Sequence, residues 1–195
     1  MSTVLVYASM SLDGYVAGAN IGVANPLGDG GERLHEWMFA EPGEPADRAI
    51  TKALRAETAA VVVGRRTFDV GVGHWGDVPY PVPTFVVTHE VRPELPQASG
   101  TFTFVSGVPA AIALATAAAG AGTVTLMGAD VQRQALAAGL VDEVMISLVP
   151  VVLGGGTRLF DGLPTGAFTG SVTHHRFGVT GSGQPTVTGA AVDAH

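Results

Sequence analysis

The sequence predicts an α/β fold of three layers, in which helices flank a mainly parallel, twisted sheet that ends in antiparallel C-terminal strands. Short apolar runs alternate with helical segments as far as Met127, an order typical of parallel strands joined by crossover helices. The last third of the chain instead carries successive strand patterns, which indicates antiparallel pairing. No repeat or long linker divides the 195 residues, so we expect one domain over residues 1–195.

The strands follow from runs of apolar, often β-branched residues. Ala59–Gly64 is the clearest, because a continuous run of this kind is typical of a strand buried on both faces. Pro150 interrupts a later strand-like stretch, and Gly181–Gly183 marks a turn between the last two strands. The predicted strands are Val4–Ala8, Ala59–Gly64, Pro83–Thr88, Thr101–Val105, Thr123–Met127, Val141–Val152 and a pair within Ser171–Val192.

Apolar spacing and end signals predict the helices between these strands. Ile50, Ala53 and Leu54 share one face of a helical segment. Asp130 is the expected N-cap of another helix, and Gly139 follows that helix at C′. The predicted helices are Glu32–Phe39, Ala46–Thr58, Pro109–Ala119 and Asp130–Ala138, while Gly14–Gly31 is glycine-rich and irregular.

The composition excludes several classes of protein. Hydrophobic residues make up 47% of the chain and charged residues 14%, which is unlike a disordered chain or a coiled coil. The most apolar helical run, at residues 110–122, is short and rich in alanine, so we expect no membrane span. The net charge is −7 and no basic cluster exceeds Arg65–Arg66, so nucleic acid is not an expected partner.

Cysteine and histidine usage bears on compartment and metals. The chain has no cysteine, which excludes disulfides, thiolate metal sites and a cysteine nucleophile. His174 and His175 lie on a predicted strand and point to opposite faces, and we expect no metal site. No basic region precedes the first apolar segment, so we expect no signal peptide and a cytoplasmic protein.

Three junctions between a strand and the following loop carry residues suited to an anion. At the first, Gly64 lets the backbone approach a ligand and Thr67 offers a hydroxyl at a helix start, while Arg65–Arg66 adds charged donors. The second is Thr88–His89, and at the third Gly128 precedes another helix N-terminus. Ordinary turns with surface arginines are the alternative explanation, and the chain lacks the GxGxxG pattern of the commoner dinucleotide fold.

Five motifs, in order along the chain, resemble a known family. They are Ser11–Gly18 (SLDGYVAG), Val63–Phe68 (VGRRTF), Val86–Thr88 (VVT), Leu140–Val144 (LVDEV) and Pro150–Phe160 (PVVLGGGTRLF). Together they resemble the dihydrofolate reductase-like superfamily, in the branch similar to the C-terminal reductase domain of riboflavin biosynthesis (RibD). The resemblance covers Val4 to Phe160 and the strands after it, and implies a dihydrofolate reductase-like fold, NADPH as cofactor and a homodimer.

The resemblance also implies which residues contact the cofactor, when the family's contact positions are carried over to the matching positions of this sequence. Ala8, Ser9, Val16 and Ala17 would flank the nicotinamide; Gly64, Arg65, Arg66, Thr67, Gly128, Ala129, Asp130, Val131 and Gln132 would meet the phosphates; Thr88 and His89 would contact the adenosine 2′-phosphate. The second phosphate loop departs from the family, which often has three successive glycines where this chain has Met127-Gly128-Ala129. Asp130 also puts a carboxylate where an anion is expected.

A reductase needs a proton source, and the resemblance leaves its identity open. Dihydrofolate reductases use a carboxylate on the first helix, but Leu34 matches that position here. His35 and Glu36 are adjacent candidate catalytic residues, or parts of a solvated helix face with Glu32. Asp13 is the third candidate, or else a turn residue.

The substrate side of the cleft is the least defined part of the sequence. Trp37 is either a wall for a flat heterocycle or a core residue. The resemblance implies that Gly154, Gly155, Gly156 and Thr157 line this side, and a wide turn is the alternative.

These inferences predict an NADPH-dependent oxidoreductase that transfers hydride to a small heterocyclic substrate, pyrimidine- or pterin-like. One alternative is the 5-amino-6-(5-phosphoribosylamino)uracil reductase of riboflavin biosynthesis, although no deaminase-type zinc motif accompanies the domain. The other is a non-catalytic NADP-binding module, which Leu34 and the altered second loop motivate. The expected partners are a small-molecule substrate and a second copy in a homodimer, without nucleic acid or membrane.

Overall fold

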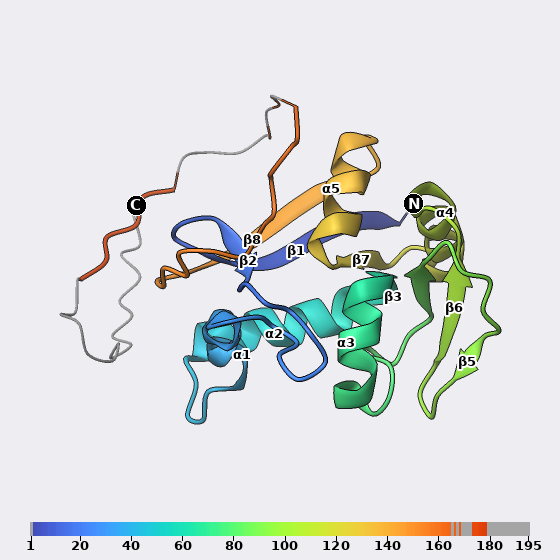
Figure 1. Cartoon of the computed structure of the whole chain (residues 1–195), viewed down its shortest axis with the longest axis horizontal. Helices are drawn as coiled ribbons and strands as arrows, with labels where there is room; N and C mark the ends of the chain where they lie inside the picture. The colour runs from blue at the N-terminus through green and yellow to red at the C-terminus, as the bar shows by residue number, and fades with distance from the viewer. Residues whose placement is uncertain (1, 165, 167, 169–172, 179–195) are drawn as a thin grey trace. The chain divides into compact units, whose positions relative to one another are not determined.

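A seven-stranded sheet is the centre of the fold (Figure 1). The computed structural model describes residues 2–164, 166, 168 and 173–178, and the chain divides into a unit of residues 1–165 and a unit of residues 166–195. The sheet order is β5-β6-β4-β3-β7-β1-β8, and all neighbours are parallel except β5 and β6. Its strands are β1 (Thr3–Ser11), β3 (Thr58–Gly64), β4 (Thr84–Val87), β5 (Leu95–Pro96), β6 (Thr101–Val105), β7 (Thr123–Met127) and β8 (Glu143–Val149). The mainly parallel α/β sheet expected from the sequence is confirmed.

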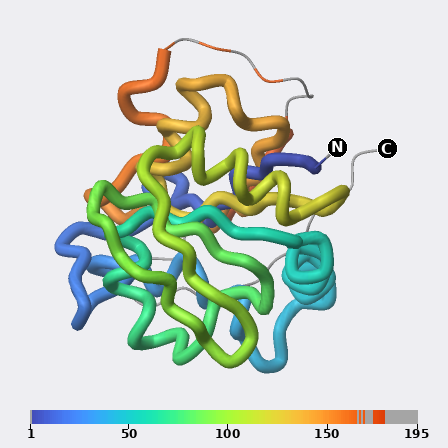
Figure 2. Tube along the Cα trace, turned by 90° about the vertical axis from the view of Figure 1, so that its right-hand side faces the viewer, coloured from blue at the N-terminus to red at the C-terminus, as the bar shows by residue number. Residues whose placement is uncertain are grey.

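Helices lie on both faces of this sheet. Figure 1 shows α5 on one face and α2 and α3 on the other, and Figure 2, turned by 90°, shows α2 nearly end-on. The helices are α1 (Glu36–Phe39), α2 (Pro45–Glu57), α3 (Arg65–Trp75), α4 (Val108–Ala119) and α5 (Ala129–Ala137), with the 3₁₀ turn η1 (Gly31–Leu34) before α1. The helices α2, α4 and α5 and the long strands therefore lie close to where the sequence predicts them, whereas for α3 the sequence predicts only a helix start at Thr67.

Three details of the predicted helices are wrong. The segment Glu32–Phe39 is two short helices, because His35, with φ −118° and ψ −8°, ends η1 as its C-cap and begins α1 as its N-cap. Helix α5 begins one residue earlier than expected, so Gly128 and not Asp130 is its N-cap. The expected apolar face of α2 is buried only at Leu54, while Ile50 stays 37% exposed.

The two faces of the sheet form two separate cores, as the alternation of side chains along a strand requires. Ala60 and Val62 of β3 pack with the helices α4 and α5 on one face. Val61 and Val63 point to the other face, where they pack with Phe68 of α3. All four of these β3 side chains are fully buried, which confirms that β3 is covered on both faces.

The expected C-terminal strand pair falls mostly outside the described residues. Residues 173–178, the described part of that segment, carry no strand, and the rings of His175 and Phe177 stack with centroids 5.9 Å apart. Antiparallel pairing within the described chain occurs instead between β5 and β6, and between the short strands β2 (Tyr15–Ala17) and β9 (Thr157–Arg158). The single domain over residues 1–195 and the homodimer stay predictions.

Close backbone packing explains part of the glycine content. Gly156 has φ +131°, and a Cβ there would overlap the carbonyl oxygen of Ala17 across the β2–β9 pair. The loop that follows β2 folds back in the same way, since the N–H of Gly18 donates to Leu27 O at 2.9 Å and the N–H of Asp29 donates to Ala19 O at 2.7 Å. The irregular stretch predicted at residues 14–31 is therefore a hydrogen-bonded loop around one short strand.

The close approach at Gly156 predicts a stability difference between neighbouring glycines. Gly156→Ala should lower the free energy of unfolding by about 3 kcal/mol, because a Cβ adds both an overlap and a strained φ. Gly155→Ala is the matched control and should cost no more than about 0.5 kcal/mol, since no atom lies within 4 Å of its Cβ position. Equal midpoints of urea unfolding for the two variants would contradict this account.

Candidate functional site

Two predicted phosphate loops meet at the carboxyl ends of β3 and β7. These strands pair in parallel with Val63 opposite Met127, so Gly64 and Gly128 follow at the same level. A Cβ added to Gly128 would lie 2.5 Å from Oγ1 of Thr67, and one added to Gly64 would lie 3.2 Å from Cγ2 of Val131. The structure thus brings residues 64–67 and 128–132 into direct contact.

Both loops open a helix whose N-terminus has no side-chain cap. Gly64 is the N-cap of α3 and Gly128 that of α5, and neither glycine can supply a capping oxygen. The first N–H of α5 that bonds within the helix is that of Gln132, which donates to Gly128 O at 3.1 Å. The preceding N–H groups at each helix start therefore point out of the helix, and together with the Thr67 hydroxyl they form a cradle suited to a diphosphate.

Two polar side chains of the second loop, those of Asp130 and Gln132, have partners outside this cradle. Asp130 is 3.7 Å from Nη2 of Arg133 and accepts a hydrogen bond of 2.8 Å from Gln134, so its carboxylate is bound along the outer face of α5. Gln132 is buried and donates to the backbone oxygens of Tyr7 and Leu126, at 3.0 and 2.9 Å. The Asp130 carboxylate thus has partners on its own helix, and Gln132 offers a ligand only its backbone.

The end of β4 carries the third predicted junction. Thr88 is buried, and its hydroxyl accepts a hydrogen bond of 3.1 Å from the N–H of Glu90, whereas His89 is exposed. Arg92 lies beside this turn and forms ion pairs with Glu90 and with Asp69 of α3. Sequence reasoning missed Arg92, because only the pairing of β4 with β3 brings it close to α3.

The residues expected beside a nicotinamide lie on β1 and β2. Ser9 is buried, and its hydroxyl accepts a hydrogen bond of 3.1 Å from Nε1 of Trp37. The same Nε1 also donates to Leu34 O at 3.0 Å, so Trp37 ties α1 to the end of β1. The side chains of Ala8 and Val16 face the core on the α4–α5 side, which leaves the backbone of these strands to meet a ligand.

Asp13 holds the glycine loop after β8. Its carboxylate accepts the N–H groups of Leu153 at 3.2 Å and Gly154 at 2.8 Å. Hydrogen bonds from the Ser11 hydroxyl and from these N–H groups lower the pKa of Asp13 to about 2. A carboxyl group with this pKa stays ionised at neutral pH, and its two hydrogen bonds hold the start of the glycine loop at Leu153 and Gly154.

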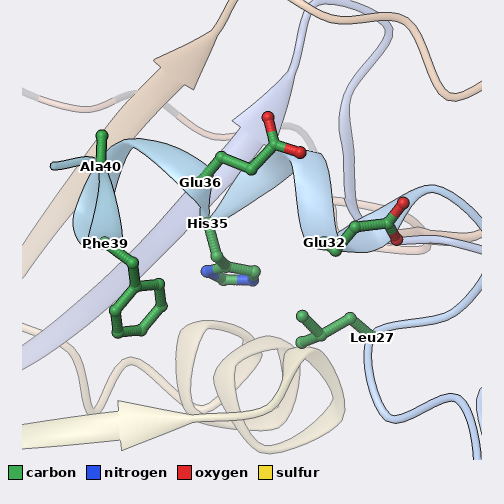
Figure 3. A pocket seen from close by; sticks show the side chains of 6 residues that line it. All are labelled: Leu27, Glu32, His35, Glu36, Phe39 and Ala40. Carbon is green, nitrogen blue, oxygen red and sulfur yellow. The ribbon is translucent and has the colours of Figure 1, made fainter.

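His35 and Glu36, the other two candidate catalytic residues, differ in direction. Both border an open hollow of about 450 Å³, and in Figure 3 the imidazole of His35 points between Phe39 and Leu27 while the Glu36 carboxylate extends the other way. Burial lowers the pKa of His35 below its usual value, so the ring is mainly neutral at pH 7. Leu34, at the expected acid position, is fully buried against Val149 and Val151.

Two further titratable groups lie on β1 and α2 and do not line this hollow. The Tyr7 hydroxyl is 3.3 Å from Oγ of Ser147, and burial raises the pKa of Tyr7. Asp47 shares the sheet-facing side of α2 with Leu54, and burial raises its pKa too, with a further contribution from Glu44. The polar alternation of Tyr7, Ser9 and Ser11 along an otherwise apolar strand was the available signal for this group.

The described residues also bear on metal and membrane binding. No group of three or more His, Asp or Glu residues in the described part of the chain is arranged to hold a metal ion. Among the helices described, none combines the length and hydrophobicity that crossing a membrane requires. Gly154 and Gly155 have open space around their Cβ positions, and Thr157 pairs with Ala17 in the small sheet.

Comparisons with known proteins agree with this architecture. The model of the RibD C-terminal domain matches residues 2–178. A putative riboflavin biosynthesis protein from Shewanella sp. PV-4 is 26% identical, with a TM-score of 0.61 over 84% of this chain and 86% of that chain. A pyrimidine reductase-like protein from Corynebacterium diphtheriae is 16% identical, with a TM-score of 0.52 over 86% and 83%. A dihydrofolate reductase from Enterococcus faecalis, complexed with NADP(H), has 16% identity and a TM-score of 0.49 over 80% and 76%. No curated protein matches the chain.

The hydrogen bonds of Asp13 predict a pH-dependent contribution to stability. The folded pKa lies below the unfolded value of about 3.9, so the contribution is present above pH 4 and is lost as the pH falls toward 2. Thermal melts of the wild type and Asp13→Asn should therefore differ above pH 4 and converge at lower pH. Asp161→Asn, at an exposed turn, should show no such convergence; a constant difference between wild type and Asp13→Asn would contradict the role of the charge.

Proposed function

Because the chain belongs to the RibD C-terminal domain family, we propose that it is an NADPH-dependent oxidoreductase that transfers hydride to a small heterocyclic substrate. The observation that carries the proposal is the cradle where α3 and α5 begin side by side, both at glycine N-caps. A diphosphate there would accept hydrogen bonds from backbone N–H groups of residues 65–67 and 129–131, with the Thr67 hydroxyl between the two helices. The positive ends of both helix dipoles favour an anion at the same place.

The chain's own residues divide the remaining tasks. When bound, NADPH supplies the hydride from its nicotinamide ring. The backbone at the end of β1, held by the hydrogen bond between Ser9 and Trp37, would orient that ring. We assign the proton to His35, because its imidazole points into the hollow and no described side chain pairs with it. Asp13 keeps the glycine loop after β8 in place.

The hollow beside α1 favours an uncharged substrate. Leu27, Phe39 and Ala40 give it apolar walls, and its six lining residues include Glu32 and Glu36 but neither Lys nor Arg. A flat neutral heterocycle fits such walls, whereas a phosphoribosyl group would bring a dianion to a hollow whose lining holds no cationic side chain. This favours a pyrimidine- or pterin-like ring without phosphate over the phosphorylated substrate of the riboflavin-pathway reductase.

A non-catalytic NADP-binding module is the second candidate function. It is favoured by Leu34, which is buried where dihydrofolate reductases have their acid, and by the ionised state of Asp13. One measurement distinguishes the reductase from the binding module: a binding module gives no NADPH oxidation with any pyrimidine, pterin or quinone-like acceptor. Oxidation of NADPH that depends on an acceptor would exclude the module.

Two glycines flank α5, and the cradle predicts that only the one before the helix, Gly128, is needed for cofactor binding. Gly128→Ala would push a methyl group against the Thr67 hydroxyl, so we expect the Kd for NADPH to rise about tenfold or more. Gly139→Ala is the matched control, because Gly139 also has a positive φ but open space around it. Both variants should lose about 1 kcal/mol of stability from backbone strain, and only Gly128→Ala should lose the thermal shift given by NADPH.

Failure of the wild-type protein to bind millimolar NADPH, by thermal shift and by fluorescence, would overturn the proposed function. Unchanged binding by Gly128→Ala would move the cofactor away from the two helix starts and remove the main support for the proposal.

A proton from His35 predicts a characteristic pH profile. Since burial lowers the pKa of His35, the value of kcat/KM should rise as the pH falls below 6.5 and the imidazole becomes protonated. His35→Phe keeps a flat ring but should lower kcat/KM about 100-fold and flatten this rise. Glu36→Gln is the control, because its side chain points away from the imidazole in Figure 3. A steep profile that survives in His35→Phe would assign the proton to another group, with Tyr7 and Asp47 next to be tested.

A further inference from the structure

Arginines gather at one corner of an otherwise acidic chain. The net charge is −7, and three of the ten Lys and Arg residues, Arg65, Arg66 and Arg92, lie beyond the carboxyl ends of β3 and β4. These strands are parallel neighbours, with Gly64 opposite Val87, so the segments that follow them leave the sheet side by side. The proposed cofactor phosphates lie at the start of α3 in the same corner.

A carboxylate connects two of these arginines. Asp69, one turn into α3, forms an ion pair with Arg65 through Oδ2 and lies 3.5 Å from Nη1 of Arg92 through Oδ1. Two guanidinium groups are thereby held close together, which without the intervening carboxylate would cost repulsion between like charges. Arg66 has no such partner among the described residues and is exposed.

Arg92 is held in place on two further sides. Its Nη2 and Nε lie 2.5 and 2.9 Å from Oε2 of Glu90, and its guanidinium lies 5.6 Å from the centre of the Phe104 ring. The buried Thr88 hydroxyl accepts the N–H of Glu90, which fixes the turn from which Arg92 extends. Arg92 is 30% exposed and Glu90 56% exposed, so solvent and a ligand can both reach the pair.

An anion that binds arginine more strongly than a carboxylate does can displace Glu90 from its exposed pair with Arg92. Arg92 lowers the pKa of Glu90, so Glu90 is ionised at neutral pH and competes for the guanidinium with any incoming anion. A phosphate monoester brings more negative charge than a carboxylate and three acceptor oxygens, and arginine binds it in bidentate geometry. An adenosine ribose without that phosphate has only neutral hydroxyls to offer and leaves the ion pair intact.

Resting on the proposed cofactor function, we propose that Arg92 determines cofactor specificity by exchanging the Glu90 carboxylate for the 2′-phosphate of the adenosine ribose. Asp69 keeps Arg92 beside Arg65 during the exchange, so that two guanidinium groups face the phosphate. Glu90 thus has a defined energetic role, because the wild-type affinity for the 2′-phosphate includes the cost of breaking the Glu90–Arg92 pair.

Equilibrium binding of two adenosine fragments tests this exchange without any substrate or turnover. Isothermal titration of the full chain with 2′,5′-ADP and with 5′-AMP isolates the effect of the 2′-phosphate. We expect the wild type to bind 2′,5′-ADP about tenfold more tightly than 5′-AMP or better. Arg92→Ala should remove most of that preference, through weaker binding of 2′,5′-ADP with 5′-AMP unchanged within about twofold.

The variant at Glu90 gives the sharper result. Glu90→Gln should tighten binding of 2′,5′-ADP by about threefold or more and leave 5′-AMP unchanged, because the competing charge is gone while the side chain keeps its size. Arg48→Ala is the matched control, since it removes an exposed arginine whose pair with Glu41 spans 3.9 Å elsewhere on the surface. It should change neither affinity.

The results that overturn the inference are distinct from those that overturn the proposed function. Equal wild-type affinities for the two fragments, equal losses of both in Arg92→Ala, or weaker 2′,5′-ADP binding in Glu90→Gln would each overturn the exchange while leaving a dinucleotide site possible. Failure of the wild type to bind either fragment or NADPH would overturn both.

Discussion

Parallel pairing of β3 with β7 is the constraint on which the candidate site depends. The register puts Val63 opposite Met127, so that the glycines that follow each strand, and the helices that follow each glycine, start at the same level. A shift of one residue would separate Gly64 from Gly128 and turn the buried valines of β3 toward the wrong faces. The cores on both sides of the sheet therefore hold the two helix starts together, and packing energy far from the site sets its geometry.

The distribution of charge favours the binding of an anion where the two helices begin. The chain as a whole repels anions weakly, with a net charge of −7, yet two helix N-termini and three arginines face one corner. Carboxylates in that corner are paired: Asp130 with residues of its own helix, Asp69 and Glu90 with arginines. Pairing keeps the arginines ordered in the free protein, and it also means that phosphate binding has to compete with an internal ion pair.

The part of the candidate site near β1 and β2 is built by close contacts between backbones and by hydrogen bonds. Gly156 allows the backbone after β8 to meet β2, and Asp13 accepts two N–H groups from the same segment. Trp37 joins α1 to Ser9 on β1. Such contacts give a rigid support to a ligand site, and they explain why Asp13 has a structural carboxylate whereas the neutral His35 is left to face the hollow.

Local sequence determined much of this protein. Continuous β-branched runs such as Ala59–Gly64 predict buried strands, and the glycines before α3 and α5 predict where the backbone approaches a ligand, because both depend on neighbouring residues alone. Tertiary structure decided the rest: Asp130 and Asp13 have their partners, His35 and Glu36 point apart, and Arg92 reaches Asp69 across twenty-odd residues of chain. Which groups meet depends on strand order and register, and strand order is a property of the whole sheet that no local pattern contains.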